Sequence, residues 1–290
     1  MTTVVIGGSD SQDLAKKVAR KIRSKYSGLQ LSSFPDGELR VRIADDITGR
    51  HVILVNGFMP NPNKNLVESV FAIQTAKQLG ASKVTLVAPY LAYMRQDKMF
   101  HPGECISAKV MAKMLDCADQ VIAVDPHLHR IKRLQDIFRA KAKSISADNA
   151  IAQYISKHWP NAIIIGPDIE SSQWAKKIAD SIGQESMILL KKRYTATKVR
   201  IIVHGDPARF RNRDVVVVDD IISTGHTMFE PIRQLKRFGA RKIICIGIHG
   251  VFVANALQKL RKMGAEVITT NTIANPAAKI DVSSAIAGAL

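Results

Sequence analysis

Residues 215–227 read VVVVDDIISTGHT: four valines, an adjacent pair of carboxylates at Asp219 and Asp220, and then a turn of small residues. An unbroken run of valines is typical of a strand that is buried on both faces, as the strands of a parallel sheet are. In an open α/β sheet, ligands bind beyond the carboxyl ends of the strands. The stretch therefore predicts an α/β fold with a ligand site beside the two carboxylates.

The same alternation recurs along the chain. Short apolar runs are separated by amphipathic stretches, beginning with TVVI (3–6) and SQDLAKKVARKIRSKY (11–26). Later apolar runs are HVILV (51–55), VTLVAP (84–89), QVIAVD (120–125), AIIIGPD (162–168) and KIICIGI (242–248). Strands that alternate with helical patterns indicate βαβ units and a mainly parallel sheet.

The chain also contains an internal sequence repeat. Residues 51–89 and 214–248 both read strand, loop, helix, Gly-Ala, Lys and strand. The first copy carries Asn56 and Gly57 where the second has the Asp pair, so only the second copy keeps the site. We predict an α/β protein of two similar domains, each a mainly parallel sheet flanked by helices. The expected domains are residues 1–145 and 146–290.

The net charge of +17 on this 290-residue chain suggests that its ligands are negatively charged. Nucleic acid, small polyphosphates and a merely basic surface are three explanations of such a charge. The Lys and Arg residues are dispersed, aromatic residues are only 6%, and no RRM, KH or zinc-finger signature occurs. These features favour a polyphosphate ligand over nucleic acid.

Targeting signals are absent from the sequence pattern. The longest apolar runs are too short to span a bilayer, and the first residues lack the basic and apolar regions of a signal peptide. The three cysteines, Cys105, Cys117 and Cys245, are widely spaced, which fits neither a disulfide framework nor a metal knuckle. We expect a soluble cytoplasmic protein that does not bind membranes.

The turn STGHT (223–227) is a candidate phosphate cradle. Small residues let successive backbone N–H groups converge, and a helix expected to begin near Met228 adds its positive end. Two carboxylates beside such a cradle suit the hydroxyls of a sugar phosphate. The alternative is a capping turn with an accidental Asp pair. A buried pair of like charges is costly without a cation or ligand, which argues against that alternative.

Residues 215–227 resemble the motif of a known family. VVVVDDIISTGHT is similar to the phosphoribosyl-pyrophosphate motif shared by phosphoribosyltransferases and ribose-phosphate pyrophosphokinases. Other stretches resemble the pyrophosphokinases, in the same order over nearly the whole chain. They are SFPDGELRVRI (33–43), PYLAYMRQDKMFHPGE (89–104), VDPHLHRI (124–131) and IIIGPDIESSQWA (163–175). The resemblance implies a type I phosphoribosyltransferase-like fold and transfer of pyrophosphate from Mg-ATP to ribose 5-phosphate.

The resemblance also implies roles for individual residues. ATP binding falls to Phe34, Asp36, Gly37, Glu38, Arg95, Gln96 and His127. Ribose 5-phosphate binding falls to Arg193, Asp219, Asp220, Ser223, Thr224, Gly225, His226 and Thr227. His127 and Asp168 are implied Mg²⁺ contacts, and Lys191 and Arg193 are implied catalytic residues. The FPDGE loop is expected to serve a neighbouring subunit, so we expect a homodimer or larger assembly with shared active sites.

Residue chemistry alone leaves simpler interpretations open at several of these places. FPDGE reads as a tight turn, YMRQDK as a solvated charged loop, and LLKKRYTATKVRI as a hairpin-like excursion with a solvated tip. His129 has no counterpart in the family and is expected to be a surface residue. Ser223 and His226 depart from the family's commonest turn, and Ser223 matches the archaeal-type variant.

Two rival functions share parts of this pattern. A phosphoribosyltransferase would share the turn, but it would need neither a second α/β domain nor the FPDGE and RQDK stretches. A catalytically silent regulatory homologue would be expected to lose the Lys-x-Arg loop or the metal residues, and both are present. The sequence therefore favours the pyrophosphokinase.

Overall fold

The computed structural model describes residues 2–193, 199–204 and 206–290 and divides them into two compact units. The first unit contains residues 2–146, 272–274 and 282–290, and the second contains the described residues of 147–271 together with 275–281. The chain first passes from the first unit to the second between residues 146 and 147, next to the expected domain boundary. The C-terminal residues differ from the expectation, because part of the segment assigned to the second domain belongs to the first unit.

The first unit is built on a seven-stranded sheet in the order β3-β2-β1-β4-β5-β6-β7. The hairpin pair β2–β3 is antiparallel and the other neighbouring pairs are parallel. Its elements are β1 (Thr3–Gly7), α1 (Gln12–Lys21), β2 (Lys25–Ser33), β3 (Leu39–Ile43), β4 (His51–Val55), α2 (Pro62–Gln78), β5 (Lys83–Ala88), α3 (Ser107–Leu115), β6 (Gln120–Val124), η1 (Leu134–Asp136), β7 (Lys141–Ile145) and α8 (Ser283–Ala287).

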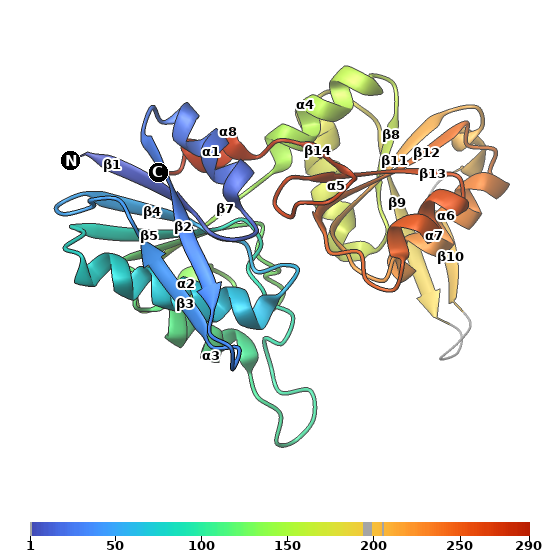
Figure 1. Cartoon of the computed structure of the whole chain (residues 1–290). Coiled ribbons are helices and arrows are strands. Elements are labelled where there is room, and N and C mark those ends of the chain that lie inside the picture. The colour runs from blue at the N-terminus through green and yellow to red at the C-terminus, as the bar shows by residue number, and fades with distance from the viewer. Residues whose placement is uncertain (1, 194–198, 205) are drawn as a thin grey trace. The chain divides into compact units, whose positions relative to one another are not determined.

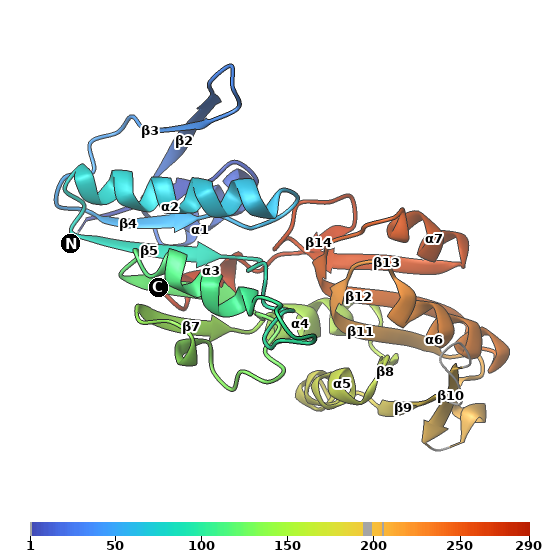
Figure 2. The same cartoon turned by 90° about the horizontal axis from the view of Figure 1, so that it is seen from below.

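The second unit repeats this topology. Its seven strands lie in the order β10-β9-β8-β11-β12-β13-β14, again with one antiparallel hairpin, β9–β10, at the edge. Its elements are α4 (Asp148–His158), β8 (Ile163–Gly166), α5 (Ile169–Ser181), β9 (Ser186–Arg193), β10 (Val199–His204), η2 (Pro207–Phe210), β11 (Asp214–Ile222), α6 (His226–Arg237), β12 (Lys242–Gly250), α7 (Ala256–Lys262), β13 (Ala265–Thr270) and β14 (Ala278–Ile280). Figure 2 shows β11, β12 and β13 side by side. The predicted α/β fold of two similar domains is confirmed.

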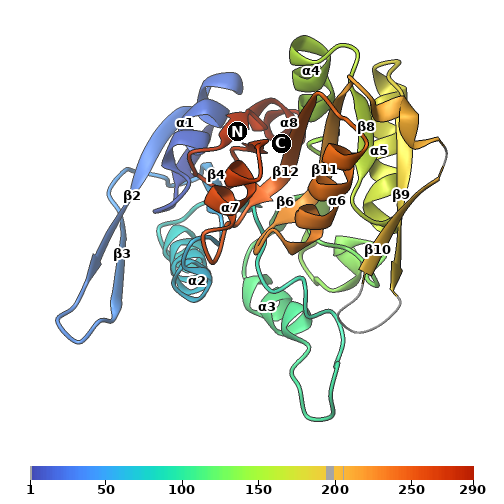
Figure 3. The same cartoon turned by 90° about the vertical axis from the view of Figure 1, so that its right-hand side faces the viewer.

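Burial of the strands on both faces explains their apolar sequences. The valines of β11, residues 215–218, are completely buried. Because side chains alternate along a strand, Val215 and Val217 join one core cluster with α6. In the first unit, α2 and α3 supply the core on one face of the sheet, and α1 and α8 cover the other (Figure 3). No helix in the described ranges combines the length and apolarity needed to cross a membrane.

Two helices, α4 and α8, belong to a different unit from the strand that precedes them in the chain. Helix α4 follows β7 of the first unit but packs against α5 and β14 of the second. Helix α8 follows β14 of the second unit but packs against α1 of the first (Figure 1). The buried side chains of Val282 and Ile286 explain why the C-terminal residues belong to the first unit.

Candidate functional site

The Asp pair lies within β11 rather than after it. Strand β11 continues to Ile222 because its pairing with β12 continues, through Ile221 opposite His249 and Ile222 opposite Gly250. Consecutive strand residues point to opposite sides, and the two carboxylates accordingly differ. Asp219 is buried, whereas Asp220 is half-buried. The two residues are therefore not equivalent ligands.

Local donors hold the Asp219 carboxylate. Its Oδ2 accepts a hydrogen bond of 3.1 Å from Thr227 Oγ1, and its Oδ1 accepts one of 3.1 Å from the backbone N–H of Asp220. Burial nevertheless raises the pKa of Asp219 well above its usual value, and the carboxylates of Asp220 and Asp168 raise it further. This end of the sheet therefore favours a ligand that brings a cation or hydroxyl donors.

The turn after β11 points a helix N-terminus toward this region. Gly225 is the N-cap of α6 with a φ of +79°, a conformation that favours glycine, and an added Cβ would lie 3.3 Å from Phe229 Cε1. Helix α6 begins at His226, two residues before the expected start. Thr224, His226 and Thr227 are exposed and Ser223 is half-exposed. The turn residues predicted to hold phosphate thus surround the exposed first turn of a twelve-residue helix.

A neighbouring loop supports the turn. After β12, the N–H groups of Val251 and Phe252 donate to the Ile222 carbonyl, and the N–H of Val253 donates to the Ser223 carbonyl. Phe252 in this loop has a left-handed φ of 43°. Sequence reasoning did not find this support, because backbone donors leave no signature in residue type.

Asp168 caps a helix in the same unit. It is the N-cap of α5, and its Oδ1 accepts hydrogen bonds from the backbone N–H and the hydroxyl of Ser171. Gly166 allows the helix to approach the strand so closely, since an added Cβ would lie 2.3 Å from the Ser172 nitrogen. The charge of the Asp168 carboxylate also raises the pKa of Asp219, after burial and the charge of Asp220. Two predicted sites, one for metal and one for sugar, therefore adjoin in the second unit.

The FPDGE stretch is the exposed tip of the β2–β3 hairpin. The N–H of Phe34 donates to the Glu38 carbonyl, and the N–H of Gly37 donates to the Phe34 carbonyl. Asp36 Oδ1 accepts a hydrogen bond from the N–H of Glu38. The turn interpretation is confirmed, and it leaves the ring of Phe34 about half exposed, at 49%. The tip presents an aromatic ring and two exposed carboxylates.

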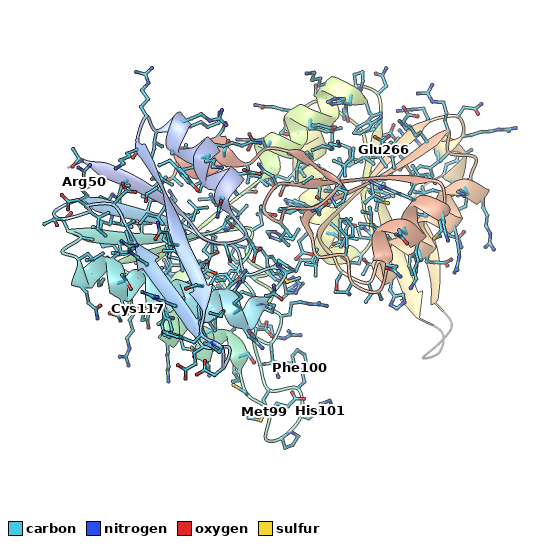
Figure 4. The ribbon with its side chains drawn as sticks, viewed as in Figure 1. Arg50, Met99, Phe100, His101, Cys117 and Glu266 are labelled. Atoms are coloured by element: carbon cyan, nitrogen blue, oxygen red, sulfur yellow. The ribbon has the colours of Figure 1, made fainter. Side chains whose placement is uncertain are left out.

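The RQDK stretch follows β5 and contacts the segment after β6. Arg95 is exposed, while Gln96 Oε1 accepts a hydrogen bond of 2.8 Å from Ser107 Oγ at the start of α3. Asp97 is buried and accepts hydrogen bonds from both the backbone N–H and the Nη1 of Arg130. Figure 4 shows the projecting loop that carries Met99, Phe100 and His101 beyond this point. The hydrogen bonds between Arg130 and Asp97 thus connect the two predicted ATP-binding segments, which follow β5 and β6.

His127 lies on the segment after β6 and has a close neighbour. Its Nδ1 lies 3.2 Å from Nε2 of His129, so the two rings share a hydrogen bond. His129 is exposed, as expected, but its contact with His127 was not expected. The His-x-His spacing was the available signal.

Two predicted residues lie beyond what the structure describes in full. The backbone of Lys191 and Arg193 belongs to β9, which pairs antiparallel with β10, so the hairpin expectation is confirmed. The side chains of these two residues, and residues 194–198 between the strands, lie outside the described part of the chain. Cys245, by contrast, is fully described, and burial raises the pKa of its thiol to about 12. It is therefore unsuited to act as a nucleophile.

Comparisons with known proteins cover nearly the whole chain. Residues 3–119 match the N-terminal domain of ribose phosphate pyrophosphokinase, and residues 133–286 match the phosphoribosyl transferase domain. A ribose-phosphate pyrophosphokinase of Sulfurisphaera tokodaii is 32% identical over 290 residues, covering 98% of this chain and 99% of that protein. One of Methanobrevibacter smithii is 34% identical, covering 99% of each chain. The crystal structure of phosphoribosylpyrophosphate synthetase from Mycobacterium smegmatis matches with a TM-score of 0.86 and 27% identity, covering 100% of this chain and 97% of that one.

Proposed function

The chain belongs to the ribose-phosphate pyrophosphokinase family, and from this premise we propose that it is an enzyme that makes phosphoribosyl pyrophosphate and AMP from ribose 5-phosphate and Mg-ATP. The observation that carries the proposal is the buried Asp219 beside the exposed first turn of α6. A site of this kind suits a sugar phosphate, and the relatives of this name match along their full length.

The ribose 5-phosphate half of the reaction is assigned to the second unit. The backbone N–H groups and hydroxyls of residues 223–227 bind the 5-phosphate, and the positive end of α6 favours its charge. Asp220, half-buried, and Asp219 accept hydrogen bonds from ribose hydroxyls. A hydroxyl donor offsets the burial of the Asp219 carboxylate, which is the reason to prefer a sugar over a simple phosphate.

The nucleotide half is assigned to three segments of the first unit. The ring of Phe34 stacks on adenine, and Asp36 and Glu38 accept hydrogen bonds from its polar edge. Arg95, which is exposed, binds phosphate oxygens. Gln96 keeps its amide N–H donors for the nucleotide, because its Oε1 already accepts from Ser107.

Magnesium fits the donors that the chain offers. Mg²⁺ prefers oxygen ligands, and the adjoining carboxylates of Asp168 and Asp219 form an acidic region whose mutual repulsion a cation relieves. We assign metal contacts to Asp168 and, by family resemblance, to His127. The ion neutralises phosphate charge when it is bound.

The chemistry is transfer of a pyrophosphoryl group. The oxygen of the 1-hydroxyl forms a bond to the β-phosphorus of ATP, the β-phosphorus–oxygen bond to the α-phosphate breaks, and AMP leaves with that oxygen while the hydroxyl proton is released. Positioning and electrostatic stabilisation supply most of the catalysis of such transfers. By family resemblance, Lys191 and Arg193 stabilise the charge that develops on the moving group, and Arg193 also contacts ribose 5-phosphate.

The test is product formation from both substrates. AMP release is measured by chromatography with and without ribose 5-phosphate, and phosphoribosyl pyrophosphate is measured by phosphorus NMR. We expect both products in equal amounts and only when ribose 5-phosphate is present. AMP release that does not depend on the sugar would refute the proposal. Consumption of phosphoribosyl pyrophosphate with a nucleobase and no ATP would identify a phosphoribosyltransferase instead.

We also propose that the cytoplasmic enzyme self-associates and that each FPDGE tip serves a neighbouring subunit. The exposed Phe34 on a projecting hairpin supports this proposal, and a two-fold contact would exchange the tips reciprocally. Asp36→Ala and Lys191→Ala chains, each inactive alone, should regain activity when refolded together. Random pairing gives half hybrids with one intact site each, so recovery should reach about a quarter of the wild-type activity. Verified hybrids without recovery would show that each site lies within one chain.

A further inference from the structure

The segment that follows β12, residues 251–255 with the sequence VFVAN, has an unusual backbone. Phe252 and Ala254 have left-handed φ angles of 43° and 52°. Residues with a Cβ rarely adopt this region, which glycine favours. Ala254 is exposed, so the packing of its side chain does not account for its conformation. Backbone strain of this kind persists only where the surrounding structure imposes it, and it concentrates at functional sites.

The segment holds two consecutive carbonyl groups of the turn after β11. The N–H groups of residues 251–252 donate to the Ile222 carbonyl at 3.1 and 3.0 Å, and the N–H of Val253 donates to the Ser223 carbonyl at 3.2 Å. In a planar trans peptide, the carbonyl and the N–H of the next residue point in opposite directions. The N–H groups of Ser223 and Thr224 therefore point away from the segment.

Those two N–H groups are free to bind a ligand. In the described part of the chain, neither the N–H of Ser223 nor that of Thr224 donates a hydrogen bond. Thr224 is exposed and Ser223 is half-exposed. Both precede helix α6, whose positive end favours an anion. Donors whose directions are fixed in advance bind an anion without the cost of ordering them.

We propose that residues 251–254 are a positioning segment for ribose 5-phosphate: by holding the carbonyls of Ile222 and Ser223, they direct the N–H groups of Ser223 and Thr224 toward the 5-phosphate. The inference rests on the proposed function and deepens it, because it makes the affinity for the sugar phosphate depend on a segment outside residues 223–227. The conformation of Ala254 is central, since it leads the chain from Val253 into helix α7.

The first test changes the preferred backbone conformation at Ala254 without removing a packed side chain. Ala254→Val disfavours the left-handed φ, because a β-branched residue rarely adopts it, whereas Ala254→Gly favours it. Ribose 5-phosphate is titrated calorimetrically into protein saturated with Mg²⁺ and α,β-methylene-ATP, an analogue that cannot release AMP. We expect Ala254→Val to weaken the affinity about tenfold, as for one lost hydrogen bond to a charged ligand. Ala254→Gly should bind as the wild type does.

Asn212→Val is the matched control. Asn212 is also exposed and left-handed, with a φ of 58°, but it precedes β11 and so lies at the opposite end of that strand from the turn. Valine there imposes a comparable backbone penalty on the same unit and should leave the affinity for ribose 5-phosphate unchanged. Wild-type affinity of Ala254→Val, or equal weakening by Ala254→Val and Asn212→Val, would overturn the inference.

The second test needs no variant. Amide hydrogen exchange is followed by NMR in the wild type with the same ATP analogue, before and after ribose 5-phosphate is added. Before addition, the N–H groups of residues 251–253 should exchange more slowly than those of Ser223 and Thr224. Ribose 5-phosphate should then slow exchange at Ser223 and Thr224. Exchange at these two residues that does not respond to the sugar phosphate would also overturn the inference.

These outcomes are distinct from those of the activity test, because neither measurement involves turnover. An enzyme that makes its product but binds ribose 5-phosphate equally well with Ala254→Val refutes the positioning role alone. A protein that shows the expected loss of affinity in Ala254→Val but releases no AMP from ATP refutes the proposed reaction alone.

Discussion

At Asp219, the proposed binding of ribose hydroxyls and the stability of the unliganded fold oppose each other. Burial, and then the charges of Asp220 and Asp168, raise the pKa of its carboxyl group, so its ionised form weakens the unliganded fold at neutral pH. Asp219→Asn removes the charge and keeps the shape. We expect a higher melting temperature without ligand at pH 7, together with a Michaelis constant that rises far more for ribose 5-phosphate than for ATP. Thermal denaturation and initial rates measure the two effects.

The difference in melting temperature between Asp219→Asn and the wild type should depend on pH in one direction. Below the pKa of an unfolded aspartate, about 3.9, Asp219 is protonated in both states, and the charge has no effect. As the pH rises through that value toward the raised pKa, the unfolded chain ionises first and the wild type loses stability that Asp219→Asn keeps. The difference in melting temperature should grow from about pH 4 upward and level off above the folded pKa. The exposed control Asp180→Asn should show no such growth. A variant less stable than the wild type at pH 7 would contradict the argument.

Residue types could be predicted here, whereas their partners could not. Asp219 and Gly225 are recognisable from residue type, because the proposed sugar site calls for a carboxylate and the positive φ of the turn favours glycine. The hydrogen bond from Thr227 to Asp219 and the one from Arg130 to Asp97 depend on three-dimensional position. Sequence spacing indicates that such groups are close, but it does not determine which atoms meet.

At the scale of elements, one ion pair joins the two loops that carry the proposed nucleotide residues. Asp97 follows Gln96, Arg130 follows His129, and their side chains meet at 3.1 Å. The Asp97 side chain is only 3% exposed, and hydrogen bonds from Arg130 lower its pKa despite burial. The guanidinium of Arg130 also lies over the ring of Phe100, at 5.7 Å. Arg130 is therefore a positioning residue for both loops.

Arg130→Met should impair nucleotide binding selectively. The variant keeps an apolar stem, but it leaves a buried carboxylate without its charged partner and frees the two loops from each other. We expect the Michaelis constant for ATP to rise about tenfold, equivalent to about 1.4 kcal/mol, with the constant for ribose 5-phosphate unchanged. Steady-state kinetics with each substrate varied in turn measure this difference.

Two further variants separate positioning from general stability. Arg133→Met removes an exposed ion pair with Asp136 and should leave both constants unchanged. Arg130→Lys should restore part of the ATP affinity, because it returns the charge without the full geometry of the guanidinium. Equal increases in both Michaelis constants for Arg130→Met would show that the ion pair stabilises the unit as a whole and does not position the nucleotide loops.

Sequence patterns located the strands and helices better than their ends or their pairings. Local periodicity predicted the parallel sheets, because each buried strand reads as an apolar run. The extension of β11 to Ile222 follows from its pairing with β12, which is not a local property. The β2–β3 and β9–β10 hairpins occupy equivalent positions in the two sheets. The internal sequence repeat did not include these hairpins, because the FPDGE and Lys-x-Arg stretches that they carry have no residue types in common.

At the scale of the whole molecule, the placement of α4 and α8 departs most from the order of the chain. Each follows the last strand of one sheet and packs against a helix of the other unit, α4 on α5 and α8 on α1. The weak pattern of residues 275–290 gave no sign of this exchange. Helix α8 is only five residues long, and two apolar side chains, Val282 and Ile286, are completely buried there. Packing rather than intrinsic helix propensity accounts for such a short helix.

Ile286→Ala should therefore weaken the first unit, although the residue lies at the end of the chain. Removing a completely buried isoleucine side chain costs about 2–5 kcal/mol of unfolding free energy through lost burial and the cavity left behind. Hydrogen exchange should show lost protection in α1 and β1. Both tryptophans, Trp159 and Trp174, lie in the second unit, so the unfolding transition followed by their fluorescence should move much less. Leu290→Ala, at a side chain that is 39% exposed, is the control and should leave exchange in α1 unchanged. If Ile286→Ala behaves like this control in α1, then α8 does not stabilise the first unit.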